Sequence, residues 1–202
     1  FYNFMNFADF GLGTWHPEKG MYSVVLAMDS LAKSRGVEFH TDSVVEKIVV
    51  NDSGKAKGIQ INGKMIESDI VISGADYHHS ETLLDFRFRA YSEDYWSKRV
   101  FAPSSLLFYI GLDKKVKNVS HHTLFFDVDF DEHARAIYDN PKWPENPLFY
   151  ANFPSISDPS MAPKNHDAFY VLVPVPNNLS KIDWKIEGKK FKNLVINKMS
   201  ET

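Results

Sequence analysis

The residues best suited to chemistry in this sequence are histidines, and their spacing does not favour a metal site. His78 and His79 are adjacent, as are His121 and His122, and no third ligand stands at a metal-like spacing from either pair or from His133. Adjacent positions also do not share one helical face closely. Serines and aspartates are scattered without the strand-to-helix turn that exposes a catalytic serine. We therefore interpret the histidines as surface or hydrogen-bonded residues.

The composition is that of a globular chain and fits a reducing compartment. The sequence has 202 residues, a formal net charge of −3, 44% hydrophobic residues and no cysteine, which excludes disulfides and thiolate chemistry. The near-neutral charge and the lack of a basic block argue against a nucleic-acid partner. Aromatic residues make up 14%. That content fits either a large aromatic core or a surface for an extended apolar substrate, and composition does not choose between them.

The first half of the chain predicts one helix followed by short strands. Apolar residues between Met21 and Ala32 recur at helical spacing, and Gly36 stands where a helix-ending glycine belongs. Asn62-Gly63 is a strong hairpin signal. The expected strands are 37–40, 44–50, 56–61, 64–67 and 69–76. The last of these ends in small residues, as a buried parallel strand does where it meets a ligand.

The second half predicts an antiparallel sheet with helices on one side. Short helices are expected at 77–84 and 92–99, with Asp76 and Ser92 as N-caps. The expected strands are 104–112, 122–127, 148–153 and 168–173, and the expected longer helices are 129–138 and 183–199, the last interrupted near Gly188. The fold class is therefore α+β or α/β.

An ordered series of motifs carries a family resemblance along nearly the whole chain. The motifs include Gly13-Thr14-Trp15-His16-Pro17, Val71-Ile72-Ser73-Gly74-Ala75-Asp76, Tyr109-Ile110-Gly111-Leu112 and Leu172-Val173-Pro174-Val175-Pro176. In this order they resemble the middle of a flavin-dependent phytoene desaturase, within the amine-oxidase-like superfamily of carotenoid and retinoid desaturases and isomerases. Two departures stand out: Lys19 occupies the place of a usual glycine, and Gly74 that of a frequent asparagine.

The resemblance implies a division of the chain into cofactor and substrate parts. Residues 20–84 correspond to part of an FAD/NAD(P)-binding-type domain. Residues 1–19 and 85–202 correspond to a truncated substrate-binding domain built on the antiparallel sheet. Gly11-Leu12-Gly13 lacks the third glycine and the preceding strand of a dinucleotide-binding motif. We therefore expect an internal piece of a longer enzyme, one that neither holds FAD nor turns over substrate when isolated.

The same resemblance supplies candidate site residues. The position matching Val45 offers backbone groups to the adenine edge of FAD, and Ser73, Gly74 and Ala75 end a strand where small residues let a cofactor approach the backbone. The candidates for lining a carotenoid tunnel are Tyr109, His121, His122 and Phe153. Each of these residues has an ordinary structural reading as well, as a strand, packing or core residue. No catalytic side chain is assigned, because the hydride acceptor of a desaturation is a flavin and not an amino acid.

The function implied by the resemblance is desaturation, or isomerisation, of a carotenoid-like polyene with FAD as cofactor. Another flavin amine-oxidase-like enzyme, a retinol saturase-like enzyme and a non-enzymatic lipid- or partner-binding module remain open. No run of residues approaches the about 20 apolar residues of a membrane-spanning helix. We expect a cytoplasmic protein, or one that docks peripherally on the cytoplasmic membrane face through an apolar patch. The oligomeric state is left open.

Overall fold

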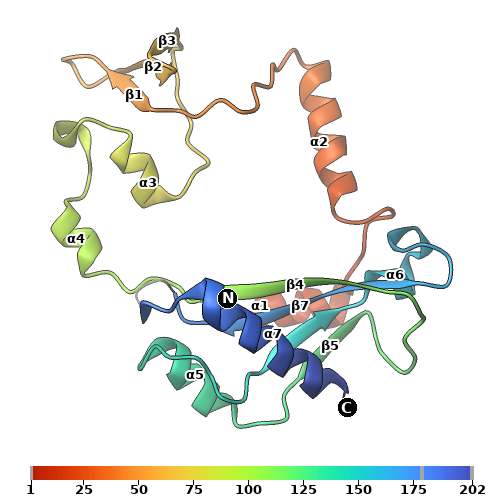
Figure 1. Ribbon diagram of the computed structural model, residues 1–202. Coiled ribbons are helices and arrows are strands. Elements are labelled where there is room, and N and C mark those ends of the chain that lie inside the picture. Colours follow the sequence, from red (N-terminus) through yellow and green to blue (C-terminus); the bar gives the residue numbers. More distant parts are fainter. Residues whose placement is uncertain (1, 178–179, 201–202) are drawn as a thin grey trace. The chain divides into compact units, whose positions relative to one another are not determined.

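The structure is a computed structural model that describes residues 2–177 and 180–200, and it divides into two compact units (Figure 1). One unit is Gly36–Val100, and the other combines Phe1–Arg35 with Phe101–Thr202. These divisions fall at positions 35/36 and 100/101, whereas the sequence suggested divisions at 19/20 and 84/85. The helix after Gly20 thus belongs to the same compact unit as the antiparallel sheet. The assignment of cofactor and substrate roles to the parts of the chain stays a prediction.

The smaller unit is built on a three-stranded antiparallel sheet in the order β1-β2-β3. Its strands are β1 (Lys47–Val50), β2 (Ala56–Ile61) and β3 (Lys64–Glu67). The predicted hairpin joins β2 to β3: Asn62 and Gly63 have φ angles of 49° and 71°, the left-handed pair that a two-residue hairpin turn requires. Gly58 is also required, because a Cβ there would lie 2.0 Å from the carbonyl oxygen of Ile66.

Two short helices complete this unit, and both predicted caps are confirmed. Asp76 accepts a hydrogen bond from the backbone N–H of His79 at the start of α3 (Tyr77–Thr82), and Ser92 accepts one from Tyr95 at the start of α4 (Glu93–Ser97). A 3₁₀ turn at Phe86–Phe88 lies between the two helices.

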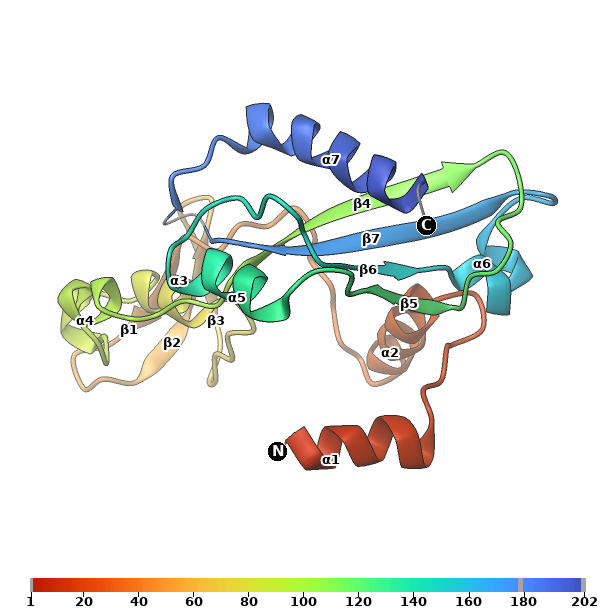
Figure 2. The ribbon, with the colours of Figure 1, turned by 90° about the horizontal axis from the view of Figure 1, so that it is seen from below.

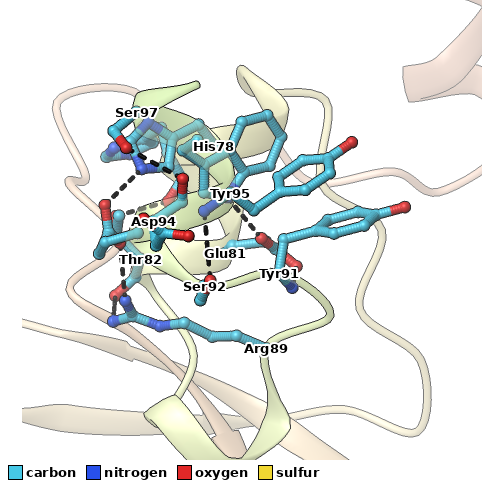
Figure 3. Close-up of polar contacts among 12 residues, drawn as sticks. His78, Glu81, Thr82, Arg89, Tyr91, Ser92, Asp94, Tyr95 and Ser97 are labelled. Atoms are coloured by element: carbon cyan, nitrogen blue, oxygen red, sulfur yellow. Dashed lines mark hydrogen bonds and ion pairs between the residues drawn. The ribbon is translucent and has the colours of Figure 1, made fainter. Parts of the chain in front are cut away.

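A buried carboxylate ties these helices together (Figure 3). Glu81 is 4% exposed. One carboxylate oxygen accepts the backbone N–H groups of Ala90 at 2.7 Å and Tyr91 at 3.3 Å, and the other accepts the indole N–H of Trp96 at 2.9 Å. The carboxylate of α3 thereby satisfies two donors of the segment that joins α3 to α4 and one donor of α4 itself.

Three of the predicted strands of this unit are wrong or too long. Residues 37–40 and 69–76 form no strand, and β1 begins at Lys47 rather than Val44. A strand needs a hydrogen-bonded neighbour, and within the described residues neither segment has one. The apolar side chains that suggested burial are instead exposed, Ile72 to 89%.

The larger unit is built on a four-stranded antiparallel sheet in the order β4-β7-β6-β5. Its strands are β4 (Ser104–Leu112), β5 (His122–Phe125), β6 (Phe149–Asn152) and β7 (Asp167–Val175), close to the predicted bounds. Burial alternates along β7 with a period of two, so one face of the sheet is the core face. Its centre contains Phe149, Ala151, Phe153, Phe169, Val171, Val173 and Val175.

The helix α7 (Trp184–Ser200) covers the core face (Figure 2). Phe191 and Val195 from this helix join the buried cluster, and the helix runs through Gly188 without the expected interruption. The helix α5 (Phe130–Tyr138), capped by Asp129, instead lines a cavity with residues of the opposite face. The expectation of helices on one side therefore describes α7 but not α5.

The remaining helices of this unit are α1, α2 and α6. α1 (Tyr2–Phe7) passes into a π-helical turn at Ala8–Leu12, and α6 (Pro154–Ser157) precedes a 3₁₀ turn at Pro159–Met161. The predicted helix after Gly20 is confirmed as α2 (Tyr22–Ser34). No residue of α2 is buried, so its apolar side is open to solvent.

Lys19 has a backbone conformation that suits glycine, the residue it replaces in the family pattern. Its φ is 66°, in the left-handed region, and its N–H donates to Asp158 Oδ2 at 2.7 Å. A side chain in this region costs roughly 1–2 kcal/mol.

We expect Lys19→Gly to raise the free energy of unfolding by about 0.5–1 kcal/mol, after the larger backbone entropy of glycine is subtracted. Urea denaturation of both chains measures it. The matched Lys117→Gly, at a residue without positive φ, should destabilise; loss of stability in Lys19→Gly would contradict the expectation.

His133 joins α5 to the sheet as a buried neutral imidazole. The N–H of Leu148 donates to its Nδ1 at 2.9 Å, so Nε2 carries the hydrogen and donates to the carbonyl of Pro174 at 3.1 Å. Burial lowers the pKa of His133, with the positive charge of Lys198 acting in the same direction and the Pro174 hydrogen bond opposing it.

The lowered pKa of His133 predicts a loss of stability in mild acid. The unfolded chain takes up a proton as pH falls through its ordinary pKa near 6.5, while the folded chain takes it up only at lower pH. The contribution of His133 to the free energy of unfolding is therefore complete above this pH. It declines below this pH, by at most about 1.4 kcal/mol per pH unit. Denaturation from pH 7.5 to 5 should show a flatter profile for His133→Gln than for the wild type. The half-buried His166→Gln is the control, and identical slopes in all three would contradict the account.

Candidate functional site

The open face of the larger sheet, opposite α7, carries a polar and aromatic row across all four strands. The register places Tyr109 opposite Tyr170, Tyr170 opposite Asn152, and Asn152 opposite His122. Side chains directly opposite on one face lie within contact distance. Tyr109 and Tyr170 have ring centroids 6.1 Å apart. Burial, with the neighbouring Tyr150 hydroxyl adding to it, raises the pKa of Tyr170 to about 12, so its hydroxyl stays protonated.

The segment before α2 covers one end of this face and borders a largely apolar cavity of about 820 Å³ that is open to solvent. Tyr109, His121 and His122, three of the four candidates for a substrate tunnel, line it. Other lining residues are Trp15, Met21, Gly111, Met161 and Phe169. The fourth candidate, Phe153, does not line it: the side chain is 2% exposed and stacks on Phe169 in the core. Strand alternation explains this, because Phe153 continues the side of β6 that carries Phe149 and Ala151.

A second apolar cavity, of about 420 Å³, lies on the same open face at the other end of the strands. Residues of the sheet and of α5 line it together, among them Ser105, Leu124, Phe130, Ile137, Tyr150 and Leu172. Leu172 pairs with Tyr150 in the register, and this pair lies two residues along each strand from the Tyr170–Asn152 pair. The two cavities therefore occupy neighbouring stretches of one sheet face.

Three imidazoles and a carboxylate gather at the rim of the larger cavity. The ring centroids of His16 and His121 are 5.0 Å apart, and those of His121 and His122 are 4.5 Å apart. Burial lowers the pKa of His121, and His122 and His16 lower it further. Hydrogen bonds from Ser160 lower the pKa of Asp158, which lies 3.8 Å from His16 Nε2. The lowered pKa values favour a neutral His121 and a charged Asp158 near neutral pH.

Sequence reasoning missed several residues of this site. It gave no role to His16, although His16 lies within the quoted Gly13–Pro17 motif, and it did not single out Tyr150, Asn152 or Tyr170. The signal was present in the strand alternation, since period two places Tyr150 and Asn152 on the same face of β6. The contact of residue 16 with residues 121 and 158 depends on long-range packing and has no local signal.

The smaller unit brings the four expected FAD-contacting residues to one cavity of about 540 Å³. Val45, Ser73, Gly74 and Ala75 all line it, with Ile48, Ile59 and Leu83. The backbone of Val45 makes no hydrogen bond to any described residue, and a Cβ added at Gly74 would meet nothing within 4 Å. An unpaired backbone beside small residues fits the approach of a planar base. These residues therefore fit a nucleotide-contacting role, which stays a prediction.

The described residues hold no group of three or more histidine or acidic side chains arranged to bind a metal ion. No described helix has the length and hydropathy needed to cross a membrane. The candidate site is thus a pair of apolar cavities on one unit and a small-residue cavity on the other.

The structure thus combines a helix-and-sheet unit that carries a small-residue cavity with a second unit whose sheet carries two largely apolar cavities. The family comparison identifies the class of protein. The model of the flavin containing amine oxidoreductases matches residues 1–173. The chain belongs to this family.

Curated relatives narrow the resemblance to carotenoid desaturases. The chain is 38% identical to a carotenoid 3,4-desaturase of Haloarcula japonica over 88% of this chain and 36% of that protein. It is 34% identical to a zeta-carotene-forming phytoene desaturase of Myxococcus xanthus over 99% of this chain and 38% of that protein. The resemblance to phytoene desaturases is confirmed. The chain spans somewhat over a third of the length of these relatives.

A solved structure shows the same fold. An oxidoreductase from Methanosarcina mazei superposes with a TM-score of 0.59 at 20% identity, covering 85% of this chain and 37% of that chain. The mixed fold expected from the sequence is confirmed by this likeness.

Proposed function

We propose that the full-length protein is an FAD-dependent oxidoreductase that desaturates a carotenoid-like polyene by hydride transfer to the flavin. Family membership and the carotenoid desaturases among the relatives support this proposal. Isomerisation of the same kind of polyene is the alternative within the same site. Amine oxidation has no support from the site, because the larger cavity has a predominantly apolar lining.

The observation that carries the proposal is the pair of largely apolar cavities along the open face of the larger sheet. The two cavities follow β4 from Ser105 to Gly111. A strand rises about 3.4 Å per residue, so this face extends over roughly 20 Å. A rigid linear polyene loses little conformational freedom when it lies along such a face, and its apolar surface is removed from water.

The residues of this chain have binding and positioning roles in the proposed reaction. When bound, FAD supplies the hydride acceptor that no side chain can provide. Val45 and the Ser73–Ala75 segment would hold part of its nucleotide. Tyr109, Phe169 and Met161 exclude water from the substrate, and Gly111 leaves room for the polyene against β4.

Product analysis tests the proposal. The full-length protein should be expressed in cells that accumulate phytoene, and the pigments should be separated by chromatography. Desaturation predicts products with a longer conjugated system and absorption at longer wavelength. Products with unchanged conjugation but altered double-bond geometry would favour isomerisation, and shorter conjugation a saturase. A protein that binds polyene but carries no flavin would favour a binding module.

We further propose that the protein is cytoplasmic and docks peripherally on the cytoplasmic membrane face, because its substrates would partition into lipid. Exposed apolar side chains around the smaller cavity support this, namely Leu124, Phe126, Phe130 and Tyr138. Sedimentation with neutral and with anionic liposomes tests it. Recovery of the full-length protein in the supernatant with both lipids would refute the docking.

A further inference from the structure

Three polar side chains of the neighbouring strands β5 and β6 form a network on the open face of the sheet that ends at His122. The amide nitrogen of Asn152 lies 2.9 Å from the Tyr150 hydroxyl and 3.2 Å from His122 Nδ1, and the Tyr150 hydroxyl lies 2.6 Å from His122 Nδ1. Asn152 is opposite His122 in the register and is 6% exposed. The network is therefore fixed by strand pairing and not by a mobile loop.

The direction of these hydrogen bonds defines which nitrogen of His122 carries the hydrogen. An amide NH₂ group can only donate, so Asn152 donates to Tyr150 and to His122. The Tyr150 hydroxyl, which accepts from Asn152, donates its own hydrogen to His122 Nδ1. Nδ1 is thus an acceptor, and the neutral imidazole carries its hydrogen on Nε2. In the described part of the chain, no residue accepts a hydrogen bond from this Nε2–H.

A fixed donor in the wall of an apolar cavity has a chemical consequence. His122 lines the larger cavity, where a hydrocarbon offers nothing to accept its N–H. With its hydrogen in place, Nε2 offers the cavity a hydrogen-bond donor and no acceptor. The adjacent His121 and His16 rings lie at the same rim. His121 Nδ1 pairs with Ser157 Oγ at 2.8 Å, whereas His16 Nε2 has no hydrogen-bond partner among the described residues and lies 3.8 Å from Asp158 Oδ2. His122 Nε2–H is the donor fixed by the sheet.

We propose that His122 Nε2–H binds an oxygen atom carried by the substrate, so that this cavity takes a polyene with a hydroxyl or carbonyl group. The inference rests on the proposed function, since it concerns the same cavity. Tyr150 and Asn152 are positioning residues, which hold His122 in the donating tautomer. An oxygen placed at His122 fixes the register of the polyene along the sheet.

The test compares two polyenes that differ only in one terminal group, the hydrocarbon 4,4'-diapolycopene and the aldehyde 4,4'-diapolycopen-4-al. Binding to the full-length flavoprotein is followed by quenching of tryptophan fluorescence, to which Trp15 in the cavity wall contributes. We expect the aldehyde to bind about tenfold more tightly, as one well-placed hydrogen bond permits. His122→Phe should abolish this preference by weakening aldehyde binding more than hydrocarbon binding. His122→Gln should restore part of it, and Tyr150→Phe should reduce it.

The outcomes separate this inference from the proposed function. If neither polyene binds the wild type, the proposed function fails. If both bind equally well, the proposed function stands and the role of His122 is refuted. Equal weakening of both ligands by His122→Phe, with an unchanged melting temperature, would also refute it. His166→Phe, at a half-buried histidine of the same unit that lines neither cavity of the sheet, is the control and should keep the full preference.

Discussion

Gly111→Trp is expected to lower kcat/KM of the full-length protein for a polyene on the order of 100-fold. Gly111 lies on β4 in the lining of the larger cavity, and a Cβ there meets nothing within 4 Å. An indole at this position would fill space that the account assigns to the substrate and displace the polyene from the sheet. Steady-state kinetics with detergent-dispersed polyene, together with the binding assay by fluorescence quenching, measure the loss.

The matched control is Gly188→Trp. Gly188 also has nothing within 4 Å of an added Cβ, but it lies in α7, the helix that covers the opposite face of the sheet. This variant should keep kcat/KM within about twofold, because a residue remote from the site changes little. Wild-type activity in Gly111→Trp would show that the substrate does not occupy this cavity. Equal losses in both variants would point to a folding defect.

Glu81→Ala is expected to cost the smaller unit about 3–5 kcal/mol of stability, the largest effect on folding that we predict. The carboxylate is buried and accepts three N–H groups, from Ala90, Tyr91 and Trp96. Removing it leaves these three donors without their partner and opens a cavity beside the indole of Trp96. Amide hydrogen exchange followed by mass spectrometry on peptides from residues 77–100 resolves this loss from the stability of the larger unit.

Glu93→Ala is the control, because Glu93 is also a glutamate and lies in α4 of the same unit. Glu93 is exposed and pairs with His78 at 3.1 Å and with Arg89 at 3.2 Å. Exposed ion pairs contribute roughly 0–1 kcal/mol, so its exchange protection should change little. A larger loss in Glu93→Ala than in Glu81→Ala would show that the buried carboxylate does not hold α3 and α4 together.

Local patterns predicted much of the secondary structure because the information lies within a few residues. Asn62-Gly63 allows one tight turn at low cost, Asp76 and Ser92 cap the helices that follow them, and period-two alternation defines β4 and β7. These features do not depend on distant partners. The segment 69–76 does: its apolar run suggested a buried strand, yet burial and pairing require a neighbour that the described residues do not supply.

The candidate site was only partly predictable for the same reason. Motif resemblance placed Val45 and the Ser73–Ala75 segment together, and the structure brings them to one cavity. It also grouped Phe153 with His122 as lining residues, although alternation along β6 directs Phe153 to the core face. The His16–His121 contact joins residues far apart in sequence through the Lys19–Asp158 hydrogen bond and the turn beside it, and no local pattern encodes it.

Anaerobic reduction of the bound flavin tests the central claim most directly. The full-length protein is purified with its FAD, mixed without oxygen with phytoene or with zeta-carotene in detergent, and followed by visible absorption. The account predicts bleaching of the oxidised flavin band together with the appearance of a polyene of longer conjugation, in equal molar amounts. A protein that retains FAD and binds the polyene, yet shows neither bleaching nor a more unsaturated product with either compound, would contradict it.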